Sequence, residues 1–172
     1  MPTLTGSYFS NTIIYLCEHN EDGAMGIMVN KPSELTLPAL FEQLTIPVTA
    51  GIPDIPVLEG GPVASDRGFI LHSSETHFAS SLDLGNGLML TTAREVLEAI
   101  AGGDGPDAYL VALGYAGWGE GQLEQEMTEN AWLNCPATRE VLFDTPFDER
   151  VQRAADGLGI NFNLISSHAG HA

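Results

Sequence analysis

The apolar segments of this chain are short, and glycine- and proline-rich turns separate them at close intervals. Two β-branched and apolar runs, at 12–17 and 24–30, flank a polar turn that ends in Gly23, which predicts a β-hairpin. Further strands are predicted at 69–72, 87–92, 108–117, 131–135, 140–143 and 161–165. The run at 108–117 is the most apolar, so we expect it to be a central strand of the sheet.

Four amphipathic helices are predicted among these strands. The first has apolar residues at Leu37, Leu40, Phe41 and Leu44, which is the i, i+3, i+4, i+7 spacing of a helix face. The others are expected after Thr92, around Leu123 and Met127, and from Thr145 to Leu158. Two strands followed by a helix favour an α+β fold with a mixed sheet over a doubly wound one. The 172 residues suit a single domain over 1–172, with loops at 45–56 and 74–86.

The charge of the chain limits its partners. It has 23 acidic and 6 basic residues, for a net charge of −17. Nucleic-acid binding needs cations that displace the counterions of phosphate, so direct binding to DNA or RNA is disfavoured, as is an anionic membrane surface. The N-terminal sequence does not read as a signal peptide, and Cys17 and Cys135 lie far apart. We therefore expect a cytoplasmic protein that does not associate with membranes.

A glycine-rich loop, GYAGWGEGQLE at 114–124, follows the most apolar strand. Its glycines do not match the GxGxxG pattern, and Glu120 and Glu124 would repel a phosphate group. The favoured interpretation is a tight turn in which Tyr115 and Trp118 pack or line a groove.

The best candidate for an anion site is the GGPV turn. Gly60 and Gly61 could present their N–H groups to a small acidic ligand, with Arg67 six residues further on and Lys31 as a second cation. The alternative is that both cations are ordinary surface residues.

Chemical motifs are otherwise scarce. Cys17 and His19 lie two apart on a strand, as a thiol and its base would, but a structural cysteine and a turn histidine are the simpler interpretation. The histidines and cysteines lack zinc-site spacing, and the carboxylates suit a solvated surface better than a Mg²⁺ or Ca²⁺ site. We therefore assign no catalytic residue, metal or cofactor.

Five segments together resemble a known family. YLCEHNEDGAMGIMVNKP, LEGGPVASDRGFILH, LGYAGWGEGQLEQE, NAWL and the terminal GHA are similar, in this order, to the YqgE/AlgH family of bacterial proteins. The resemblance implies a single-domain α+β fold with a bent, barrel-like mixed sheet flanked by helices. The AlgH name implies a role in transcriptional regulation without establishing contact with DNA. Family members usually carry about ten more residues, an apolar strand, before the position of Met1. Either the start is misassigned or truncated, or this member lacks that strand, in which case we expect an exposed sheet edge.

The family pattern includes polar positions that folding alone does not readily explain. They are His19, Asn30, Arg67, Gln122 and Glu124, and they would define a site if they cluster in space. We expect a non-enzymatic binding or regulatory domain that acts through a small ligand or a protein partner. One alternative is a small-molecule enzyme with a site around the GGPV and GYAGW loops. A weaker alternative is a regulator that binds DNA directly, which the charge opposes.

Overall fold

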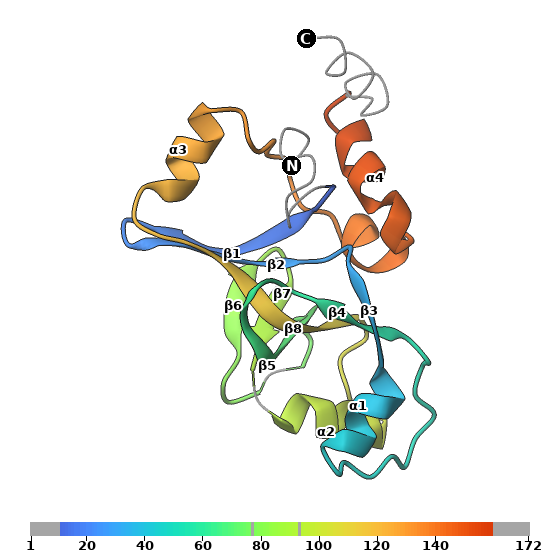
Figure 1. Ribbon diagram of the computed structural model, residues 1–172. Helices are drawn as coiled ribbons and strands as arrows, with labels where there is room; N and C mark the ends of the chain where they lie inside the picture. Colours follow the sequence, from blue (N-terminus) through green and yellow to red (C-terminus); the bar gives the residue numbers. More distant parts are fainter. Residues whose placement is uncertain (1–10, 77, 93, 160–172) are drawn as a thin grey trace. The chain divides into compact units, whose positions relative to one another are not determined.

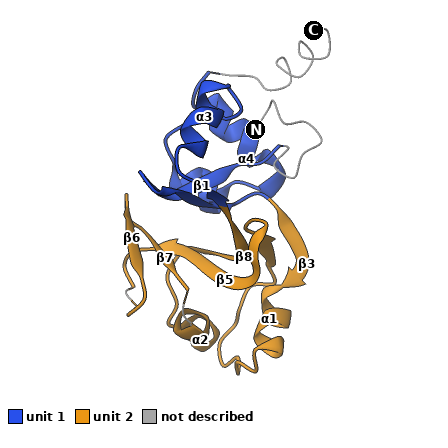
Figure 2. Cartoon of the chain, turned by 60° about the vertical axis from the view of Figure 1, so that its left-hand side comes forward, with its two compact units in different colours: residues 1–30, 117–172 blue, residues 31–116 orange. Residues whose placement is uncertain are grey.

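The computed structural model describes residues 11–76, 78–92 and 94–159 (Figure 1). The chain forms two compact units, which Figure 2 draws in different colours. Unit 1 comprises Met1–Asn30 and Gly117–Ala172, and unit 2 comprises Lys31–Ala116. Each unit contains both strands and helices, so the predicted α+β class is confirmed.

Unit 2 is built on a mixed sheet. Its strands are β3 (Pro32–Thr36), β4 (Pro56–Glu59), β5 (Val63–Ser73), β6 (Leu82–Gly85), β7 (Leu88–Thr91) and β8 (Tyr109–Trp118), whose last two residues belong to unit 1. They lie in the order β3-β4-β8-β5-β7-β6. Only β4 and β8 pair in parallel, and the other pairs are antiparallel. β8 has a neighbour on each side, which confirms the predicted central strand.

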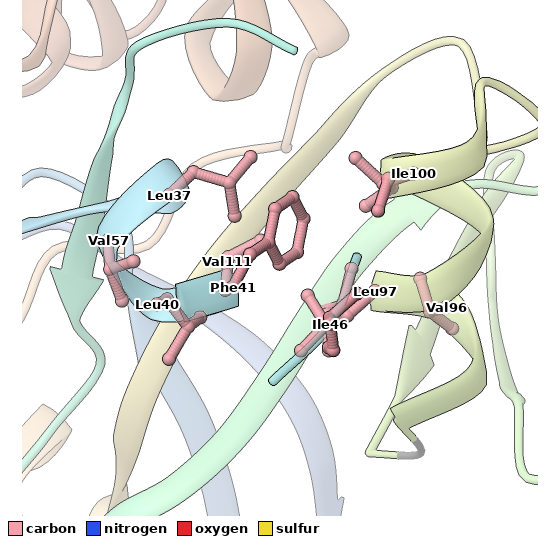
Figure 3. Close-up of a cluster of buried hydrophobic side chains, with 11 residues drawn as sticks. Leu37, Leu40, Phe41, Ile46, Val57, Val96, Leu97, Ile100 and Val111 are labelled. Atoms are coloured by element: carbon pink, nitrogen blue, oxygen red, sulfur yellow. The ribbon is translucent and has the colours of Figure 1, made fainter. Parts of the chain in front are cut away.

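Two helices cover the core of unit 2. α1 (Leu37–Gln43) starts where predicted, because the Thr36 hydroxyl accepts a hydrogen bond from the Ala39 N–H at 3.3 Å and Pro38 is tolerated in the first turn. α2 (Arg94–Gly102) follows β7. Figure 3 shows Phe41 of α1 and Ile100 of α2 pointing toward one another beside Val111 of β8. Each such buried side chain stabilises the unit by about 1.5–3 kcal/mol relative to an exposed one.

Unit 1 contains the predicted hairpin, formed by β1 (Ile14–Asn20) and β2 (Gly23–Met28). The backbone at Gly23 packs against the end of β8, where a Cβ atom would lie 2.2 Å from the Trp118 carbonyl oxygen. The other elements of unit 1 are α3 (Gln122–Thr128), a π-helix (Glu140–Asp144), a 3-10 turn (Phe147–Glu149) and α4 (Arg150–Asp156). Within the described ranges, no helix has the length and apolar character needed to cross a membrane.

Several predicted elements were wrong. The strand predicted at 140–143 is the π-helix, because the Thr138 hydroxyl accepts from the Val141 N–H and the Thr145 hydroxyl donates to the Glu140 carbonyl. Residues 131–135 form no strand, since none of the described residues pairs with them and Pro136 follows. The predicted loop at 74–86 contains β6, an exposed edge strand. The predicted fourth helix begins at Arg150 rather than Thr145, and the strand predicted at 161–165 lies outside the described residues.

Candidate functional site

A groove with a volume of about 360 Å³ opens on unit 1. Its lining residues come from β1, the end of β8, α3 and the segment that follows α3. Figure 1 labels these elements. The apolar lining residues are Ile14, Leu16, Trp118, Leu123, Met127, Trp132 and Leu133. The polar lining residues are His19, Glu124 and Asn134. The groove is therefore an apolar surface with a few polar groups.

Three of the apolar lining residues are exposed to solvent. Leu16 is 42% exposed, Met127 37% and Leu133 44%. Single exposed apolar side chains are normal on a protein surface, but three that line one groove form a contiguous patch. An apolar patch that lines a groove is a candidate surface for contact with another molecule.

A hydrogen-bonded carboxylate fixes the aromatic wall of the groove. The rings of Trp118 and Trp132 meet edge to face, with centroids 5.7 Å apart. Both indole N–H groups donate to Oε1 of Glu126, at 3.2 and 2.9 Å. Gln122 donates to Oε2 of Glu126 at 3.0 Å and accepts from the Gly119 N–H at 2.9 Å. Three donors on one carboxylate hold both indoles in a fixed orientation before anything binds.

An ion pair lies at the rim of the groove. Nε2 of His19, on β1, contacts Oε1 of Glu124, on α3. The hydrogen bond from His19 is the main cause that lowers the pKa of Glu124 below its ordinary value. Glu124 is therefore ionised at neutral pH and accepts hydrogen bonds there.

Three of the candidate residues, His19, Trp118 and Glu124, line this groove. Gln122 is not among the lining residues, but its side chain donates to Glu126, which bonds both indoles. Asn30 has a different role, because its side chain accepts from the Ile13 N–H at 3.0 Å and donates to the Asn11 carbonyl at 2.8 Å. Asn30 thus fixes the chain that leads into β1.

The other five candidates belong to unit 2, and backbone contacts explain the glycines among them. The Gly60 N–H donates to the Leu113 carbonyl at 2.8 Å, so it is already used within the fold. A Cβ atom at Gly60 would lie 2.2 Å from the Gly114 carbonyl oxygen, and one at Gly61 would lie 2.0 Å from the Tyr115 carbonyl carbon. These glycines let two backbone segments lie in contact.

The two cations predicted at the GGPV turn are also placed on unit 2. The Arg67 guanidinium lies 5.5 Å from the ring centroid of Phe69, whose ring meets that of Tyr115 edge to face. The Lys31 carbonyl accepts from the Glu59 N–H at 2.8 Å, next to Gly60. Arg67 and Tyr115 thus both contact the ring of Phe69, and Lys31 borders the same strand end as the glycines.

Seven of the ten residues that line the groove were not predicted as site residues. Leu16 and Met127 were interpreted only as parts of a strand and a helix, and Trp132 and Leu133 as a strand. Glu126 was not proposed as a site residue at all. One signal could have found them: both tryptophans of the chain belong to segments close to α3, and a pair of large aromatic residues near an acidic helix suggests a recognition surface.

Cys17 is predicted to be unreactive. Burial, with a smaller contribution from Glu18, raises the pKa of its thiol from 9.0 to about 12. A β-bulge between Leu16 and Glu18 also interrupts the alternation that would place Cys17 and His19 on one face. We expect iodoacetamide to modify Cys17 on the order of 30-fold more slowly in the native protein than in urea, because the lower thiolate fraction outweighs its higher nucleophilicity. Peptide mass spectrometry over pH 7–10 measures this, and a native rate with a midpoint near pH 9 would contradict it.

The structure defines a mixed α+β protein with an open, mostly apolar groove on unit 1. The chain belongs to the AlgH-like family (DUF179), whose model matches residues 1–163, so the resemblance found in the sequence is confirmed. UPF0301 proteins of Shewanella putrefaciens and Thioalkalivibrio sulfidiphilus are each 51% identical to this chain. The alignments cover 100% of this chain and 94% and 92% of those proteins.

Solved structures support the same assignment. The solution structure of AlgH from Pseudomonas aeruginosa is 48% identical, with a TM-score of 0.79, and covers 100% of this chain and 92% of that one. A crystal structure of a Corynebacterium diphtheriae protein is 19% identical, with a TM-score of 0.65, and covers 87% of this chain and 78% of that one. The second similarity concerns the fold alone.

Proposed function

We propose that this protein is a binding module whose groove on unit 1 receives bulky apolar side chains of a partner protein. The observation that carries the proposal is that Leu16, Met127 and Leu133 remain exposed while lining one groove. Covering them removes apolar surface from water, which is the main favourable term in protein association.

The composition of the groove favours a polypeptide over a small metabolite. Tryptophan and methionine are enriched at protein interfaces, and a methionine side chain adapts its shape to different partners. A metabolite site fixes the orientation of its ligand with a few precisely placed polar groups that are directed at the ligand. Here the polar lining residues are only His19, Glu124 and Asn134, and the first two bond to each other.

The electrostatics of the groove support binding rather than catalysis. A general acid or base works best with a pKa near the working pH. Hydrogen bonding from His19 shifts the pKa of Glu124 in the opposite direction, away from neutrality. A carboxylate in this state is suited to holding a cation or a hydrogen-bond donor.

The arginines support an indirect route for any role in transcription. Arg94 pairs with Glu98 at 2.9 Å, Arg153 pairs with Glu140 at 2.5 Å, and Arg150 is buried. Arg67 and Arg139 lie over aromatic rings. All five arginines thus have partners within the fold, so we propose that regulation runs through a bound protein rather than through phosphate contacts.

Replacing Leu133 by glutamine is expected to weaken partner binding. Both tryptophans of the chain line the groove, so the intrinsic tryptophan fluorescence reports its occupancy. We expect a neutral amphipathic peptide of leucine and glutamine, without tryptophan, to shift this fluorescence saturably. Leu133→Gln should raise the Kd about fivefold, which is the cost of about 1 kcal/mol for losing an apolar contact.

The matched control is Leu82→Gln. Leu82 has a similar exposure, 49%, but lies on β6 of unit 2. We expect this variant to keep the wild-type Kd. An equal increase of the Kd in both variants would refute the proposed groove. So would the absence of any fluorescence change when the peptide is added to the wild-type protein.

A further inference from the structure

A second, shallower hollow adjoins the apolar groove and has a different chemistry. It has a volume of about 530 Å³ and is lined by Glu21 and Glu120 together with His19 and Glu124, the two residues that it shares with the groove. The His19–Glu124 pair therefore marks the point where the apolar surface meets the acidic one. A ligand that lies across this point meets hydrocarbon on one side and carboxylates on the other.

Among the residues that the structure describes, no lysine or arginine lines either depression. In the described part of unit 1, the arginines all lie between 139 and 153, and each is engaged there. Arg139 lies 5.9 Å from the centroid of Phe143, Arg150 is buried, and Arg153 pairs with Glu140. Among the described lining residues, His19 is therefore the one whose side chain can carry a positive charge.

The cation that suits this hollow is organic rather than a metal ion. Throughout the described ranges, no three histidine, cysteine or acidic side chains are placed to hold a metal. Carboxylates spread along a rim instead suit the ammonium and guanidinium groups of long, flexible side chains, which reach separate acceptors.

The net charge selects among the possible occupants of the groove. A second copy of the chain would bring another −17 charge to an acidic surface, and like charges oppose that contact. An anionic lipid surface is repelled for the same reason. A basic segment of a different protein is attracted instead, and its encounter is accelerated by the long-range field.

We infer that the partner segment is basic and amphipathic, with bulky apolar side chains in the groove and an adjacent lysine or arginine at Glu124 and Glu120. This inference rests on the proposed function and adds the charge of the partner to it. In the free protein, His19 is hydrogen-bonded to the carboxylate of Glu124. On binding, the incoming ammonium or guanidinium group replaces His19 as the donor to that carboxylate.

The test compares three peptides of equal length, all without tryptophan: leucine with lysine, leucine with glutamine, and leucine with glutamate. Tryptophan fluorescence titrations at 50 and 300 mM salt give the Kd of each. We expect the lysine peptide to bind at least about tenfold more tightly than the glutamine peptide at low salt, and its advantage to shrink at high salt. The glutamate peptide should bind most weakly.

Two variants separate a local contact from the general attraction to an acidic protein. Glu124→Gln and Glu149→Gln remove the same charge, but Glu149 belongs to the 3-10 turn and lines neither depression. We expect Glu124→Gln to raise the Kd of the lysine peptide about two- to fivefold more than Glu149→Gln does. The Kd of the glutamine peptide should be the same in both variants.

The outcomes distinguish the two claims. If the lysine and glutamine peptides bind equally, the basic partner is refuted while the apolar groove stands. If both variants weaken binding of the lysine peptide equally, the inferred contact at Glu124 is refuted. If no peptide changes the tryptophan fluorescence, the proposed function itself fails. A glutamate peptide that binds most tightly would also overturn the inference.

Discussion

Replacing Gly114 by alanine is expected to lower the free energy of unfolding by about 3 kcal/mol or more, because two separate costs add. Gly114 lies in β8 with a φ of +80°, a conformation that side chains with a Cβ atom rarely adopt. A methyl group there would also lie 2.3 Å from the Gly61 carbonyl oxygen and 3.1 Å from that of Val63. Both contacts are with backbone, which cannot move aside as a side chain can.

The matched control is Gly68→Ala, in β5 of the same unit. No atom lies within 4 Å of a Cβ atom built at Gly68, and its φ is not positive. We expect this variant to unfold within about 0.5 kcal/mol of the wild type. Urea unfolding followed by far-ultraviolet circular dichroism measures both variants, and equal midpoints would show that the backbone at Gly61 and Val63 does not approach β8 tightly.

Local sequence signals predicted much of the fold. The hairpin, α1 and β8 were predicted because a polar turn, a helix face with a first-turn proline and a fully apolar run each determine structure within about ten residues. The π-helix at Glu140–Asp144 was missed because EVLF has strand-like composition. Its helical conformation depends on hydrogen bonds to Thr138 and Thr145, which composition alone does not reveal.

The groove was only partly predictable, because it is assembled from distant segments. His19 and Glu124 were singled out separately, yet they lie 105 positions apart, and nothing in the sequence pairs them. Glu126 is a similar case. A carboxylate on an exposed helix reads as a solvated charge, and its role is clear only once both indoles are seen to donate to it. Tertiary contacts, rather than any motif, turn these residues into one surface.

The second large effect is expected at Arg150, whose side chain is 3% exposed although it is charged. Its Nε donates to the Thr145 carbonyl at 2.9 Å, and another guanidinium nitrogen donates to the Val29 carbonyl. Its Cζ lies 4.4 Å from the ring centroid of Phe147. Arg150→Met keeps much of the apolar volume but leaves two carbonyl groups without their donor, at about 1–3 kcal/mol each. Burial disfavours the charged guanidinium and lowers its pKa to about 10. Because Arg150→Met removes this buried charge, part of the cost is offset.

The net expectation for Arg150→Met is a loss of about 2–4 kcal/mol in the free energy of unfolding of unit 1. Tryptophan fluorescence in urea measures it, because Trp118 and Trp132 both belong to this unit. Arg153→Met is the control, since Arg153 pairs with Glu140 at an exposed position and should cost no more than about 1 kcal/mol. Arg150→Lys keeps the charge, but an ammonium group lacks the planar fork that reaches two carbonyls. Its loss in free energy of unfolding should therefore lie between those of Arg150→Met and Arg153→Met. Equal midpoints for Arg150→Met and Arg153→Met would mean that the buried guanidinium does not hold the end of β2 to the chain before α4.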